Sequence, residues 1–258
     1  LGLVLALPHL VDTGHFKTLL QENVQRHTGQ QLDIAGPLDL RLFPWLAVEL
    51  GESTLGAPGA MEPIARVRSA RVAVRLLPLL QGRVEADTVS AEGLHLRLVR
   101  DAQGRGNWEP LLAAGDGDTG GSGESGLALA VGGLDLREAS LSYVDEAAGT
   151  RYRLAGLALT TGPVAPGEPV TLEATGRVRA MPRDLEAEVA AAARVALPAG
   201  GGDIQVDDLD ARVRFLRPPQ GLAAARARLA GDLRVLPGGA GVQLAARTLA
   251  AEVATAGD

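Results

Sequence analysis

An alternation of apolar and polar residues between Thr28 and Gly56 constrains the fold of this chain more than any other feature. The odd-numbered neighbours Gln31, Asp33, Asp39, Arg41 and Glu49 are polar. Eight even-numbered positions are apolar: Leu32, Ile34, Leu38, Leu40, Leu42, Leu46, Val48 and Leu50. A period of two residues puts the two sets on opposite faces of a β-sheet. The segment therefore predicts a sheet with one apolar face and one hydrated face.

The same alternation returns along the rest of the chain. Leu94, Leu96 and Leu98 alternate with His95 and Arg97. Further strands are expected around residues 153–161, 169–179, 203–216 and 223–235. The segment 184–197 is ambiguous, because its many alanines favour a helix while its apolar residues keep the spacing of a strand. We interpret it as a strand.

Composition supports a mainly β fold with an aliphatic face. Aromatic residues are only 3% of the chain, so large rings contribute little to the apolar surface. The 33 glycines and 15 prolines supply frequent turns, which fits many strands better than long helices.

Charge and residue content argue against several classes of function. A net charge of -6 does not favour a nucleic-acid partner, because phosphate contacts need clustered lysine and arginine. The chain has no cysteine, and its four histidines lack the spacing of a metal site. No catalytic set of residues stands out at a spacing that chemistry requires. We therefore expect no enzyme activity, no metal and no cofactor.

The N-terminal region has a different pattern. Phe16, Leu19, Leu20, Val24 and His27 fall at helical spacing, which predicts an amphipathic helix over residues 12–28 that ends at Gly29 and packs on the sheet. The preceding LGLVLALP is apolar but shorter than the roughly 20 residues of a membrane span. Two interpretations are open for residues 1–8: the remnant of a membrane anchor, or a buried strand.

Local signals divide the remainder of the chain. Ala35-Gly36-Pro37 is interpreted as a hairpin turn, and a change of arginine parity predicts a bulge near Ser69-Ala70. Residues 115–126 lack any apolar side chain and are expected to be a flexible linker. The expected organisation is an anchor remnant at 1–8, a helix at 9–28, a first β-groove region at 29–114, the linker at 115–126, and a second β-groove region at 127–258.

Several short motifs resemble the N-terminal region of the AsmA family of Gram-negative envelope proteins. They occur in the order and spacing of that family, and they include Gly36, Phe43-Pro44-Trp45, Leu55-Gly56, Pro78-Leu79-Leu80 and Asn107-Trp108. The resemblance covers nearly the whole chain and is strongest before residue 110. It implies a periplasmic protein of the bridge-like lipid-transfer type, anchored in the inner membrane by an N-terminal helix, with a long curved antiparallel β-sheet that forms an open apolar groove.

This resemblance gives a function to the apolar face. The first hypothesis is that the face binds phospholipid acyl chains and supports outer-membrane biogenesis. The residues expected to line the groove are Leu32, Ile34, Leu38, Leu40, Leu42, Leu94, Leu96 and Leu98. The alternative is a structural module that assists outer-membrane protein assembly, in which the apolar face is a closed core and envelope proteins bind the sheet edges.

Overall fold

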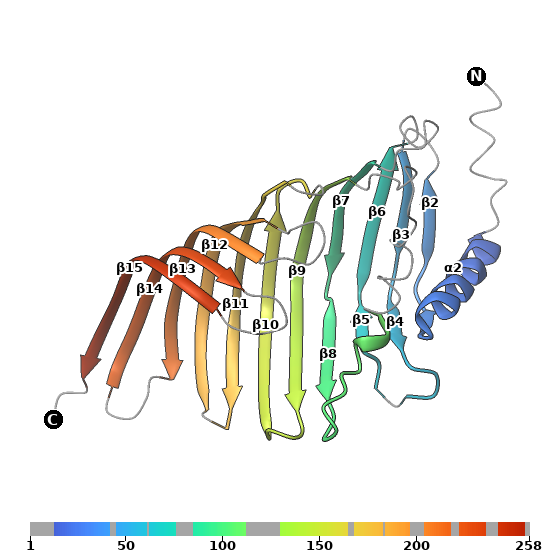
Figure 1. The fold of residues 1–258 in the computed structure, drawn as a ribbon. Coiled ribbons are helices and arrows are strands. Elements are labelled where there is room, and N and C mark those ends of the chain that lie inside the picture. The colour runs from blue at the N-terminus through green and yellow to red at the C-terminus, as the bar shows by residue number, and fades with distance from the viewer. Residues whose placement is uncertain are drawn as a thin grey trace.

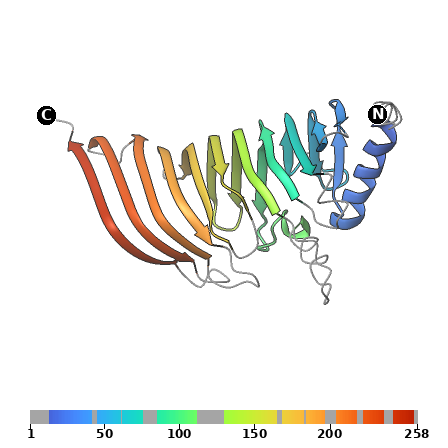
Figure 2. The ribbon, with the colours of Figure 1, turned by 90° about the horizontal axis from the view of Figure 1, so that it is seen from above.

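The structure, a computed structural model, describes residues 13–41, 45–60, 62–75, 85–111, 130–164, 168–182, 184–196, 204–217, 222–235 and 242–255. These residues form one open, curved sheet of 15 strands with a helix at one end (Figure 1). Seen from above, the strands beyond β10 bow along their length (Figure 2). The mainly β fold and the open curved sheet expected from the sequence are confirmed.

The N-terminal half of the sheet contains the shorter strands. They are β1 (Gln31–Ile34), β2 (Leu38–Arg41), β3 (Trp45–Leu50), β4 (Ser53–Gly56), β5 (Ala65–Val67), β6 (Ser69–Arg75), β7 (Glu85–Glu92) and β8 (His95–Arg100). The C-terminal half contains longer strands. They are β9 (Ala130–Asp145), β10 (Thr150–Thr161), β11 (Val170–Met181), β12 (Leu185–Ala196), β13 (Ile204–Arg217), β14 (Leu222–Val235) and β15 (Val242–Thr255). The Ala-rich segment is therefore a strand.

The short strands are long strands interrupted by kinks. β1 pairs with β4 and β2 pairs with β3, so Ala35-Gly36-Pro37 is not the hairpin turn that the sequence predicted. The amides of Ala35 and Gly36 both donate to the carbonyl of Glu52, at 2.9 Å each, which is the two-against-one pattern of a bulge. A Cβ atom on Gly36 would lie 2.4 Å from the Glu52 nitrogen. Glycine is thus needed where the two backbones cross.

Bulges recur along the sheet and increase its local twist. The bulge predicted near Ser69-Ala70 lies at Arg68, between β5 and β6, where the Arg68 amide donates to the Glu92 carbonyl at 3.1 Å. Register shifts also interrupt the β9–β10, β10–β11, β12–β13 and β13–β14 ladders. Repeated bulges bend the strands, so the sheet curls without closing.

One junction in the sheet is parallel. β7 and β8 both pair in parallel with β9, whereas the other ladders are antiparallel. A parallel neighbour requires the chain to return to the same end of the sheet, which needs a long connection. Residues 101–129 make that connection, and the expected linker at 115–126 lies within the part outside the described residues. The strands before and after it belong to one sheet.

The helix α2 (Thr13–Thr28) lies against the β1 edge of the sheet (Figure 1). The Gln21 side chain donates from Nε2 to the carbonyl of Leu32 at 3.0 Å and so covers part of that edge. Phe16, Leu20 and Val24 are half-buried, while Leu19, which was assigned to the same stripe, is 41% exposed. The predicted helix is confirmed, and Gly29 ends it with a positive φ of 66°. Residues 1–12 lie outside the described part.

Burial near this helix gives a stability prediction. Ile34 is 1% exposed, whereas Leu249 on the far edge strand is 77% exposed. Ile34→Ala should lower the free energy of unfolding by about 2 to 4 kcal/mol, because it deletes buried methyl groups and leaves a cavity. Leu249→Ala should change it by less than about 0.5 kcal/mol. Urea unfolding followed by circular dichroism measures both, and equal losses would contradict this assignment of the core.

Candidate functional site

The apolar face of the sheet carries rows of aligned apolar residues that cross every strand-to-strand boundary. The first row follows the register from β1 to β14. Its members are Leu32, Leu55, Ala65, Leu96, Leu141, Leu154, Val178, Ala187, Phe215 and Ala225. Directly opposite residues in neighbouring strands share a face and lie about 4.5 to 5.5 Å apart at Cβ. The row is therefore an unbroken apolar strip along the long axis of the sheet.

A second row runs parallel to the first. Its members are Leu38, Leu50, Ala70, Ala91, Leu136, Leu159, Ala174, Ala191, Ala211, Leu229 and Leu249. The bulges in β9 and β10 shift the numbering parity between strands but return the apolar residues to the same face. The two rows together define what we call the apolar groove.

The structure places six of the eight predicted lining residues on the face of this groove. Leu32 and Leu96 belong to the first row and Leu38 to the second, while Ile34, Leu40 and Leu98 continue the same face on β1, β2 and β8. Leu94 immediately precedes β8, and its side chain is half-buried. Leu42 lies outside the described residues. Sequence reasoning missed the C-terminal members of both rows, although the alternation of residues 170–195 signals them.

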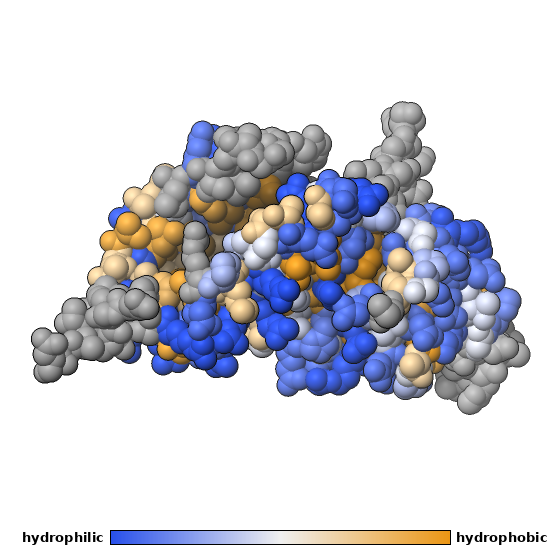
Figure 3. Space-filling model, turned by 90° about the horizontal axis from the view of Figure 1, so that it is seen from below, coloured by the Kyte–Doolittle hydropathy of each residue, from blue (hydrophilic) through white to orange (hydrophobic). Residues whose placement is uncertain are grey.

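Burial on the groove is partial. Among the described residues, Ile34 is the only large side chain less than 2% exposed. Most members of both rows are half-buried, and Leu249 is largely exposed. Figure 3 shows hydrophobic residues in hollows over the C-terminal strands and the middle of the sheet, bordered by hydrophilic residues. The inner residues of a closed sandwich would be buried by a facing sheet, and the described residues contain one sheet only.

A loop folds against one end of the groove. Asn107 bonds twice to β8: its Oδ1 accepts from the Val99 amide at 3.0 Å, and its Nδ2 donates to the Arg97 carbonyl at 2.9 Å. These bonds hold Trp108 with its ring centre 6.0 Å from that of Tyr143, which lies on the groove side of β9. The Asn-Trp motif is therefore a structural clamp that lays an aromatic ring beside the groove.

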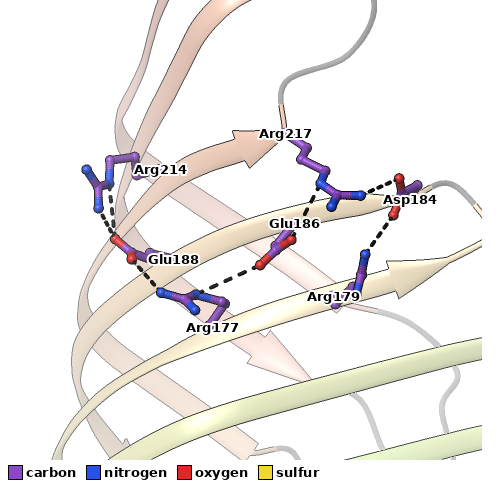
Figure 4. Close-up of polar contacts among 7 residues, drawn as sticks. All are labelled: Arg177, Arg179, Asp184, Glu186, Glu188, Arg214 and Arg217. Atoms are coloured by element: carbon purple, nitrogen blue, oxygen red, sulfur yellow. Dashed lines mark hydrogen bonds and ion pairs between the residues drawn. The ribbon is translucent and has the colours of Figure 1, made fainter.

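The opposite face of the sheet is charged and carries many ion pairs. Glu188 accepts from Arg177 at 3.3 Å and also from Arg214 (Figure 4). Asp184 pairs with Arg217 at 2.7 Å and with Arg179 at 3.4 Å. The side chains in these pairs are about one third to over one half exposed, so each pair contributes little to stability. Their main effect is to keep this face hydrated.

The arginines also bias the ionisation of these carboxyl groups. Hydrogen bonds from Arg214 and then Arg177 lower the pKa of Glu188. Hydrogen bonding and charge attraction from Arg217 lower the pKa of Asp184. Both carboxyl groups therefore stay ionised at the pH values where free carboxyl groups begin to protonate.

No group of three or more His, Cys, Asp or Glu side chains is arranged to hold a metal ion among the residues that the structure describes. Within the same residues, no helix has the length and apolar character needed to cross a membrane.

A one-layer sheet with an apolar groove on one face and a charged opposite face defines an open β-groove protein. A sequence profile described as the AsmA family matches residues 1–247. The chain therefore belongs to the AsmA family, and this membership supports an envelope-related function. The chain is also similar to Protein AsmA of Escherichia coli (strain K12), with 33% identity over 93 residues, which are 36% of this chain and 15% of that protein.

The charged face gives a prediction about acid. The pKa of Glu188 is lower in the folded state than its ordinary value of 4.5, so ionised Glu188 stabilises the fold at pH values above 4.5. This contribution is lost as the pH falls through the lowered pKa of the folded state. Glu188→Gln should therefore be less stable than the wild type near neutral pH and similar to it in strong acid. Urea unfolding over a pH series measures the difference.

Glu173→Gln is the control for this experiment, because Glu173 is exposed on the same face and forms no ion pair within the described ranges. A stability difference between wild type and Glu188→Gln that stays constant down to strong acid would contradict the assigned linkage.

Proposed function

We propose that the apolar groove binds phospholipid acyl chains, as the periplasmic lipid-transfer groove of an AsmA-family protein anchored to the inner membrane. The observation that carries this proposal is the pair of apolar rows that cross the sheet while remaining only partly buried. Water contact with such a surface is unfavourable, and exposed apolar patches of this extent mark binding sites for apolar partners.

The energetics of acyl chains suit this surface. Removing one methylene group from water stabilises it by about 0.8 kcal/mol, so a lipid tail gains on the order of 10 kcal/mol in an apolar groove. A bilayer offers nearly the same gain, and transfer between membrane and groove is then close to neutral. Apart from Phe215, the members of the two rows are aliphatic, and their side chains carry no polar atoms, which favours passage of lipid over tight retention.

The shape of the site supports transfer rather than storage. The rows run along the long axis of the sheet, from the helix end to the β15 edge, so a lipid tail meets the same surface at each step. The charged face lies on the other side of the backbone layer and stays hydrated, so acyl chains are expected on the apolar face alone. Lipid supplied through the groove would support outer-membrane biogenesis, which agrees with the envelope-related function of the family.

Two neighbouring alanines in β12 provide a matched test. Ala191 lies in the second apolar row, and Ala192 is exposed on the charged face. Ala191→Glu should reduce co-purifying phospholipid by at least about tenfold, because an unpaired carboxylate in an apolar path is strongly unfavourable. Ala192→Glu should leave it unchanged, because its side chain is exposed on the opposite face. Phospholipid is measured by extraction from the purified chain and mass spectrometry.

Circular dichroism and thermal unfolding of both variants complete the experiment. Folded Ala191→Glu with no lipid supports the proposal. Wild-type protein free of lipid, or unfolding of Ala191→Glu beside a stable Ala192→Glu, would favour a face sealed by the polypeptide itself, as the assembly-module alternative requires.

A further inference from the structure

The charged face contains a depression of about 900 Å³ that spans β10 to β15. A strongly twisted sheet is saddle-shaped, so a hollow forms on this face as well as on the groove side. Small residues leave room in it: Gly156, Thr175, Ala190 and Ala250 all line the depression. The backbone layer separates it from the apolar groove, so it is a different site from the one proposed for acyl chains.

The lining of this depression is strongly basic. Its charged side chains are five arginines and two glutamates: Arg177, Arg212, Arg214, Arg226, Arg228, Glu188 and Glu252. The chain as a whole has a net charge of -6, so this is a local reversal of sign. Such a concave basic surface attracts anions and raises their local concentration.

Sheet register places like charges directly opposite each other here. Arg212 faces Arg228, and Arg214 faces Arg226, across the β13–β14 ladder. Like charges in directly opposed positions are unfavourable in a sheet. A bound anion between the two strands would relieve this repulsion.

The available carboxylates offset the repulsion only in part. Asp210 is shared by Arg212 and Arg228, at 3.0 and 2.9 Å. Glu188 is shared by Arg177 and Arg214 (Figure 4). Each carboxylate thus serves two guanidinium groups, and positive charge remains in excess.

Among these arginines, Arg226 has the guanidinium group most available to a ligand. Within the described ranges it forms no ion pair, even though Glu252 is its register partner on β15. Its side chain is exposed on the wall of the depression. Five N–H donors in a planar fork match the oxygens of a phosphate group, and such contacts form without displacing an existing partner.

We propose that this depression binds a compact ligand carrying two or more phosphate groups, held between Arg226 and Arg228 on β14 and Arg212 and Arg214 on β13. Neighbouring strands are about 4.8 Å apart and residues i and i+2 about 7 Å apart, so the four arginines surround an area that linked phosphates span and one carboxylate does not. Two sources supply this chemistry: a soluble oligophosphate, or the phosphorylated headgroup of a lipid presented from outside the groove.

Calorimetric titration of the 258-residue chain with sodium tripolyphosphate tests the site. Flotation with vesicles that contain cardiolipin, whose headgroup has two linked phosphates, compared with phosphatidylcholine vesicles, tests the lipid source. Arg226→Gln should weaken binding at least about tenfold, because charged hydrogen bonds are lost. Arg234→Gln is the matched control: it lies on the same strand and face but outside the depression. Added NaCl should weaken binding in both arms.

The outcomes are distinct. Arg226-dependent binding of tripolyphosphate identifies a soluble ligand, and Arg226-dependent binding of cardiolipin vesicles alone identifies a headgroup. Failure of the wild type to bind either probe would overturn the proposal. Equal weakening by Arg226→Gln and Arg234→Gln would also overturn it, because it would reduce the effect to general surface charge. Neither experiment measures the phospholipid held in the apolar groove, so a failure here is distinguishable from a failure of the proposed function.

Discussion

The hydrogen-bonded register between neighbouring strands is the constraint on which the rest of this structure depends. Because side chains alternate with a period of two, a slip of one residue would move the apolar set of a strand to the charged face. The register instead aligns Leu154 with Val178 and Val178 with Ala187, and it does so across the sheet. Where the sequence parity changes, as between Leu136 and Leu141, a bulge restores the face. The bulges that curve the sheet are thus the same features that keep the groove continuous.

The two faces of the sheet have different roles in stability and in ligand binding. Few large side chains are buried among the described residues, and Ile34 alone is less than 2% exposed, so the fold does not rest on a conventional core. It rests on long backbone ladders, on the helix at the β1 edge, and on a charged face that stays in water through pairs such as Arg177–Glu188. Such a design leaves the apolar rows available for a ligand. It also allows the charged face to carry a separate anion site without disturbing the groove.

Local patterns predicted most of the fold. Alternation identified the strands from β10 to β14, and parity decided in favour of a strand for the Ala-rich β12 despite the helical preference of alanine. Strand pairing was harder to predict from the sequence. Ala35-Gly36-Pro37 has the composition of a hairpin turn, but hydrogen bonds to the distant residues Glu52 and Gly51 make it a bulge. No separate strand was assigned after residue 235, although β15 extends the sheet. Six of the predicted lining residues lie on one face: Leu32, Ile34, Leu38, Leu40, Leu96 and Leu98. The extent of the groove and the arginine cluster depend on long-range register, which no single segment encodes.

The central claim is that lipid tails contact the apolar rows and nothing on the opposite face. Photo-cross-linking tests it directly, with a benzophenone side chain introduced at Leu172 on the groove side of β11 or at Glu173 on the charged side. After irradiation in cells, mass spectrometry of the purified protein should find phospholipid adducts at position 172 and none at position 173. Adducts at both positions in equal amount, or at neither, would contradict the account.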